Sequence, residues 1–135
     1  MRRMLPQLDE LNRPFWTGGA NGALQIQRCA DCGRWQHPPG EACAHCHGRV
    51  LSFQSTQGVG RIASFTVNHQ KWAPDQDVPN VIVLIELDEQ PGLRLTSTLV
   101  GAAPDSVSIG QDVVVEFQQC ADVWLPFFRL LNPRT

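Results

Sequence analysis

The feature that most constrains this chain is a pair of Cys-x-x-Cys motifs, Cys29 with Cys32 and Cys43 with Cys46, separated by ten residues. Each motif places two sulfurs on one side of a tight knuckle, and two facing knuckles supply four soft ligands to a tetrahedral metal. This spacing predicts a zinc ribbon. Four protein ligands leave no open position for water or substrate, so the metal is expected to be structural.

Other uses of the cysteines remain open. Two disulfides would need an oxidising compartment, but residues 1–6 contain no apolar run that would direct export, so a cytoplasmic protein is expected. Iron is the alternative to Zn²⁺ because it binds the same four thiolates. Three histidines lie close enough to replace a cysteine, although four thiolates already complete the site: His37, His45 and His47.

Charge and hydropathy exclude some classes of protein. The net charge is −2, and no apolar run approaches the length of a membrane span. Residues 1–61 hold seven Arg against four acidic groups, whereas residues 62–135 hold four basic against nine acidic groups. The anion-attracting half therefore contains the cysteines, and the acidic half does not fit a nucleic-acid coat.

The pattern divides the chain into an N-terminal helical segment (1–22), the zinc ribbon (23–54) and a β domain (55–135). Leu5, Leu8 and Leu11 recur every three residues, which predicts one or two short helical turns ending near Pro14 or Gly18. Around the cysteines, strands are expected at 24–27 and 50–53.

The β domain contains five candidate strands, at 60–68, 80–87, 93–100, 111–118 and 123–131. The composition of 88–92 predicts a hairpin turn, and 104–110 is long enough for a short helical turn. Five strands with a break between the third and fourth indicate an OB-fold barrel, with SH3-like barrels as the alternative. The fold class is therefore mainly β.

A set of short motifs, taken in order, resembles a known bacterial and archaeal family of zinc-ribbon plus OB-fold proteins associated with acyl-CoA. The matching residues are Phe15-Trp16, Gly18, 24–29, Cys32-Gly33, Pro38-Pro39, Cys43, Cys46, 58–60, 64–67, Val78-Pro79, 86–89, Gly110 and Val113. The resemblance implies a rubredoxin-like ribbon and an OB-fold able to receive acyl-CoA. It also implies a role as a small partner subunit of thiolase-type enzymes in ketoacyl-CoA thiolysis, aldol cleavage or acyl transfer.

Candidate binding residues follow from what coenzyme A requires, namely cations for its phosphates and a flat apolar platform. The candidate ligand contacts are Arg34, Arg61, Lys71 and Trp72. Aromatic residues near both ends of the chain are candidates for contact with a protein partner: Phe15, Trp16, Trp124 and Phe127. Burial is the ordinary alternative for each aromatic residue. Trp35, beside Arg34, is a further candidate platform for the ligand, and packing between ribbon and barrel is the competing expectation for it.

No catalytic constellation is visible in the sequence. Cys120 is the one cysteine outside the ribbon motifs, and a lone cysteine is more often a small buried hydrophobe than a nucleophile. His69 follows a strand without an identifiable partner. The sequence therefore indicates a non-catalytic binding subunit, with a single-stranded nucleic-acid module as the alternative because zinc ribbons and OB-folds also serve that role.

Overall fold

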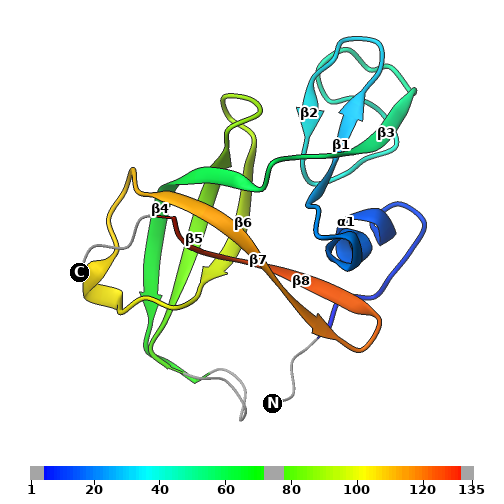
Figure 1. The fold of residues 1–135 in the computed structure, drawn as a ribbon. Coiled ribbons are helices and arrows are strands. Elements are labelled where there is room, and N and C mark those ends of the chain that lie inside the picture. The colour runs from blue at the N-terminus through cyan, green and yellow to red at the C-terminus, as the bar shows by residue number, and fades with distance from the viewer. Residues whose placement is uncertain (1–4, 72–77, 132–135) are drawn as a thin grey trace.

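The structure is a computed structural model that describes residues 5–71 and 78–131. A small three-stranded sheet and a closed five-stranded barrel stand side by side, and a short helix lies between the small sheet and the far end of the last two strands (Figure 1). The mainly β class, the ribbon and the OB-fold barrel are confirmed. Among the described residues, no helix is long and apolar enough to cross a membrane.

The small sheet contains β1 (Gln25–Cys29), β2 (Trp35–Gln36) and β3 (Leu51–Ser55), in the antiparallel order β2-β1-β3. The flanking strands β1 and β3 lie close to where they were expected. No strand was predicted at β2, because a run of two residues has no periodicity to read.

The barrel contains β4 (Val59–Asn68), β5 (Asn80–Leu87), β6 (Arg94–Leu99), β7 (Asp112–Cys120) and β8 (Val123–Leu130). They close in the order β4-β5-β6-β8-β7, so the third strand meets the fifth. Every second residue of β5 is buried in the barrel core, as a strand with one face toward the core requires. The connection before β7 holds the expected short turn, η2 (Pro104–Ser106).

The N-terminal helix begins later than the leucine spacing indicates, but it ends beside Gly18, one of the two predicted ends. It comprises α1 (Arg13–Thr17) followed by the 3₁₀ turn η1 (Gly18–Asn21). Pro14 stands in the first turn, where its missing N–H costs nothing, so it begins the helix rather than ending it. Phe15 is buried against the barrel core, and Gly19 approaches β8 so closely that a Cβ there would lie 2.6 Å from Trp124 Cβ.

One glutamine joins the ribbon to the barrel. Gln90, in the β5–β6 turn, accepts a hydrogen bond from Trp35 N at 2.9 Å and donates one to Trp35 O at 2.9 Å. These two bonds satisfy the outer edge of β2, which has no further strand beside it. Trp35 itself packs against the barrel core, the second of its two expected roles, and carries the Arg28 guanidinium 4.8 Å above its ring.

We expect Gln90→Ala to loosen the ribbon from the barrel. The change removes both bonds to Trp35 and exposes a strand edge, which should cost about 1–3 kcal/mol of stability. Amide hydrogen exchange at Trp35 should become faster, while β7 amides remain protected. The matched control is Gln118→Ala on the exposed face of β7. Unchanged exchange at Trp35 would show that Gln90 does not hold the two parts together.

Candidate functional site

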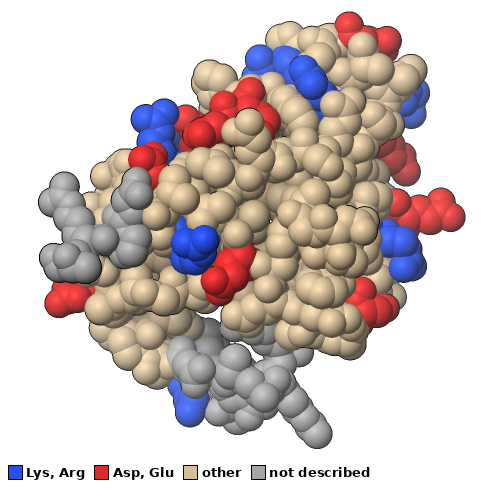
Figure 2. Space-filling view, in the orientation of Figure 1, with Lys and Arg blue, Asp and Glu red and all other residues tan. Residues whose placement is uncertain are grey.

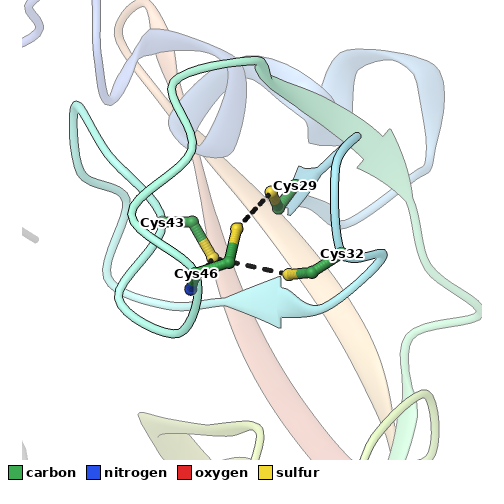
Figure 3. Close-up of side chains that lie close together, drawn as sticks. All are labelled: Cys29, Cys32, Cys43 and Cys46. Atoms are coloured by element: carbon green, nitrogen blue, oxygen red, sulfur yellow. Dashed lines mark hydrogen bonds between the residues drawn. The ribbon is translucent and has the colours of Figure 1, made fainter.

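The four ribbon cysteines converge on one point. Their sulfurs all lie within 4.8 Å of one another, with Cys29 and Cys46 3.6 Å apart and Cys32 and Cys43 also 3.6 Å apart. Cys29 ends β1 and Cys32 lies in the turn after it, whereas Cys43 and Cys46 lie on the facing loop, and the side chains point toward a shared centre (Figure 3). A tetrahedral metal with bonds of about 2.3 Å requires sulfurs about 3.8 Å apart, so the four cysteines are positioned to bind a metal.

The first knuckle depends on a glycine. Gly33 has φ +79° and donates its N–H to Cys29 O at 2.9 Å, while Cys29 N bonds Arg34 O at 2.9 Å. The left-handed conformation is open to glycine without the steric cost that a Cβ brings. This turns the chain back under the sulfurs.

The second knuckle repeats this path with different residues. His47 takes the left-handed position with φ +64°, and its N–H donates to Cys43 O at 2.9 Å. Gly48 is required for space, because a Cβ there would meet the Asp31 carboxylate and lie 3.2 Å from Cys46 Sγ. His47 is thus a backbone counterpart of Gly33, and the four-sulfur cluster needs no histidine to complete its ligand set.

Backbone N–H groups prepare the sulfurs to carry negative charge. The N–H groups of Cys46 and His45 donate to Cys43 Sγ at 3.5 and 3.4 Å, and they lower the pKa of that thiol to about 6. At Cys46 the Gly48 N–H acts in the same direction, but the Cys29 thiol, burial and the other two sulfurs outweigh it and raise the pKa to about 12. The crowded sulfurs therefore resist full ionisation unless a cation lies among them.

Two glutamines link the second knuckle to the body of the ribbon. Buried Gln27 donates to Gly40 O at 2.8 Å and accepts from Gly40 N at 2.9 Å. Gln36 donates to Gln27 Oε1 at 2.7 Å and to Ala42 O at 3.2 Å, and accepts from Ala44 N at 2.9 Å. Both side-chain amides therefore donate and accept hydrogen bonds, and these bonds fix the loop formed by residues 37–42 to β1 and β2.

An open groove runs between this loop, the N-terminal segment and the barrel. Its volume is about 860 Å³, within the range of small-molecule sites. The lining is mostly apolar, with Arg94 as the one Arg or Lys among the described residues. The walls are formed by Leu5, Pro6, Asn12, Phe15, Trp16, His37, Pro38 and Pro39, and the barrel side by Leu84, residues 94–98 and residues 125–127.

The ring of His37 forms part of the groove lining. It stacks on Phe15 with 4.8 Å between ring centres, and burial lowers the pKa of His37. The imidazole is therefore held as a neutral aromatic wall rather than as a cation. Arg94 then supplies the cationic charge on this lining.

Three of the candidate partner residues meet at this groove. Phe15 and Trp16 form an edge-to-face pair with ring centres 4.8 Å apart, and Trp16 packs against the apolar cluster that contains Phe127. Phe15 and Phe127 are buried, whereas Trp16 and Trp124 are half-buried. Trp124 packs against η1 rather than on the groove lining. Contact with a partner through these residues stays a prediction.

The candidate ligand residues do not come together. Arg34 lines a polar hollow of about 310 Å³ beside the ribbon, and Arg61 lines another of about 390 Å³ near Asp88 and Asp112. Lys71 is exposed just beyond the end of β4, and Trp72 lies outside the described residues. Their role in ligand binding stays a prediction, and no single described hollow collects them.

Arg94 provides the positive charge on the groove lining, and it was not among the ligand residues predicted from the sequence. Its side chain bonds Glu86 Oε1 at 3.2 Å across the β5–β6 pair. The available signal was its place at the start of an expected strand, directly after a turn. That signal does not reveal which face of the barrel is covered by the ribbon.

The two residues considered for chemistry lie apart from the cysteines. Half-buried Cys120 ends β7 opposite Val123 and packs with a small apolar cluster, whereas His69 is exposed. Among the described residues, the four cysteines form the one group of three or more Cys, His, Asp or Glu close enough to hold a metal. On the face seen in Figure 2, charged residues of both signs are scattered around a broad uncharged area, and no continuous basic surface is seen there.

Comparison with known proteins identifies domains of the same kind as this ribbon and barrel. Residues 16–52 match the ChsH2 rubredoxin-like zinc ribbon domain, and residues 54–118 match the ChsH2 C-terminal OB-fold domain. A solved chain described as Ltp2-ChsH2(DUF35) aldolase is 37% identical, with a TM-score of 0.82, covering 95% of this chain and all of that one.

Two curated relatives are named for different roles, one as a hydratase subunit and the other as a scaffold protein. A probable enoyl-CoA hydratase alpha subunit of Thermomonospora curvata is 35% identical over 98% of this chain, which spans 41% of that subunit's length. A DUF35 domain-containing scaffold protein of Methanothermobacter thermautotrophicus is 33% identical over 71% of this chain and 72% of the relative. The matching ribbon, barrel and full-length likeness together show that this chain belongs to the ChsH2 (DUF35) family of zinc-ribbon plus OB-fold proteins.

Proposed function

We propose that this chain is a non-catalytic accessory subunit that docks on a thiolase-like enzyme and helps to bind its acyl-CoA substrate. The observation that carries the proposal is the full-length likeness to the chain described as Ltp2-ChsH2(DUF35) aldolase. The hydratase-subunit relative supports the acyl-CoA part of the proposal, and the scaffold relative supports a role in assembly.

The structure agrees with a binding subunit in two respects. The four-cysteine cluster uses all tetrahedral positions of a metal, so it offers no site for a reacting water. The groove between ribbon and barrel is apolar and large enough for part of an acyl-CoA. Docking through Trp16, Trp124 and neighbouring residues would place this groove beside the reactive groups of the partner enzyme.

The ion is proposed to be Zn²⁺. Four thiolates suit zinc and iron alike, and a closed structural site needs no redox change, which is the setting in which zinc is common. When bound, the ion would neutralise the crowded sulfurs of Cys29, Cys32, Cys43 and Cys46 and would supply folding free energy to a ribbon too small to stabilise itself.

Native protein should contain one equivalent of zinc, measurable by elemental analysis. Cys43→Ser should lose the ion and unfold the ribbon, because metal binding of about 10–16 kcal/mol is also folding free energy in such sites. Cys120→Ser is the matched control and should keep both metal and fold. Iron in place of zinc would revise the ion, and a native protein without either metal would contradict the ribbon assignment.

The second prediction concerns turnover. The isolated chain should not process acyl-CoA, whereas co-expression with the thiolase-like subunit should yield a stable complex with activity. Steady-state assays of chain, partner and complex separate these outcomes. Turnover by the chain alone that disappears in Cys120→Ala or His69→Ala would identify it as an enzyme. Tight binding of an oligonucleotide with no affinity for acyl-CoA would favour the nucleic-acid alternative.

A further inference from the structure

The barrel has a weak seam between β6 and β8. This is its one parallel pair among the described strands, and the strands are in register at a single point, Leu99 opposite Phe128. Two residues earlier on each strand, toward the groove, the strands are no longer in register, and Ser97 Oγ donates to Pro126 O at 2.8 Å. The groove of about 860 Å³ runs along this seam.

The hydrogen-bond pattern shows which β6 groups face the seam. Leu87 N donates to Leu93 O at 2.8 Å. Because hydrogen-bonded pairs alternate along an antiparallel ladder, the backbone N–H and C=O groups of Leu95 and Ser97 also point toward β5. The backbone N–H and C=O of Arg94 and Thr96 therefore turn away from β5, toward β8. Thr96 is exposed, and it lies outside the single point at which β6 and β8 are in register.

Pro126 is the reason that the seam stays open. Leu131 N bonds Asp112 O at 2.9 Å, and the same alternation along β7 and β8 turns the backbone nitrogen of Pro126 toward β6. Proline has no N–H, so β8 offers no donor where a ladder would pair with Thr96 O. The result is a stretch of β6 that is out of register with β8 and lines an apolar groove.

We propose that the pantetheine arm of acyl-CoA lies along this edge of β6, with an amide of the arm hydrogen-bonded to the backbone of Thr96. The arm is narrow and extended and carries amides that pair with a strand edge as a peptide would. Arg94 lies on the same lining and presents a cation to the phosphates, and Phe15 and Trp16 form the apolar wall for the acyl chain. This inference rests on the proposed function.

A small ligand fits this groove better than a strand of a partner protein. The volume is in the small-molecule range, and the lining combines Pro38 and Pro39 from the ribbon with Thr98 and Phe127 from the barrel. Arg94 is held at the start of β6 by Glu86, with both side chains partly exposed, so an incoming phosphate can compete for the guanidinium.

Thr96→Pro tests the edge directly. It removes the seam-facing N–H without removing a bond to β5, so the barrel should still fold, whereas Thr96→Val changes the side chain and keeps the N–H. Calorimetric titration with hexanoyl-CoA and hexanoyl-pantetheine, on the full chain and on its complex with the partner, should show about tenfold weaker binding of both to Thr96→Pro. Thr96→Val should bind within about twofold of the native protein.

Arg94→Gln tests the contact with the phosphates independently of the contact with the pantetheine arm. It should weaken hexanoyl-CoA about tenfold and leave hexanoyl-pantetheine unchanged, because the shorter ligand lacks the nucleotide phosphates. If Thr96→Pro fails to fold, the native protein still gives an answer, since added ligand should slow hydrogen exchange of the Thr96 amide.

The outcomes distinguish this site from the proposed function. Hexanoyl-CoA binding that neither variant alters and that leaves the Thr96 amide unprotected would overturn the site and preserve the function. Absence of binding to chain and complex alike would overturn both. Protection of the Thr96 amide by the partner subunit alone, without ligand, would assign the edge to a protein strand and overturn the inference.

Discussion

Crowding of four cysteine sulfurs within 4.8 Å is the constraint on which the ribbon depends. Thiolates so close together repel one another, and the thiols do not form a packed core of useful size, so a bound cation is what makes this arrangement favourable. The surrounding backbone is already shaped for it. Gly33 and His47 turn the two knuckles, and N–H groups point at Cys43 and Cys46.

The order created at the metal site extends to the groove through amide side chains. Gln36 bonds the second knuckle at Ala44, and Gln27 bonds the loop of residues 37–42 at Gly40. Gln90 then ties β2 to the barrel through both backbone groups of Trp35. The ribbon thus acts as a rigid wall placed over β6 and β8. Neither the ribbon nor the barrel forms the groove alone, because its lining comes from both.

Much of the fold could be predicted from the sequence because its signals are local. The cysteine spacing predicted the cluster, and alternating residues bounded by turns predicted all five barrel strands, with β5 matching its predicted range. The start of the helix was placed too early because Leu5, Leu8 and Leu11 suggested a helical face, whereas Pro14 supports a helix start. The domain boundaries and the ligand and partner residues stay predictions.

The groove could not be predicted because it depends on contacts between distant segments. Arg34 and Arg61 belong to the same basic half of the chain, yet they line different hollows, since charge counts carry no information about facing surfaces. The open seam depends on which way Pro126 points, and that follows only from the register of β7 and β8. A proline inside an expected strand was the one local sign of this seam.

Amide hydrogen exchange before and after removal of the metal from the full chain tests most directly whether the ribbon metal positions the groove. The account predicts faster exchange at Gly40 and Trp35, whose N–H groups bond Gln27 and Gln90, while amides of β5 and β7 keep their protection. Unchanged exchange at Gly40 and Trp35 after complete loss of the metal would contradict it, because the groove wall would then be held without the ion.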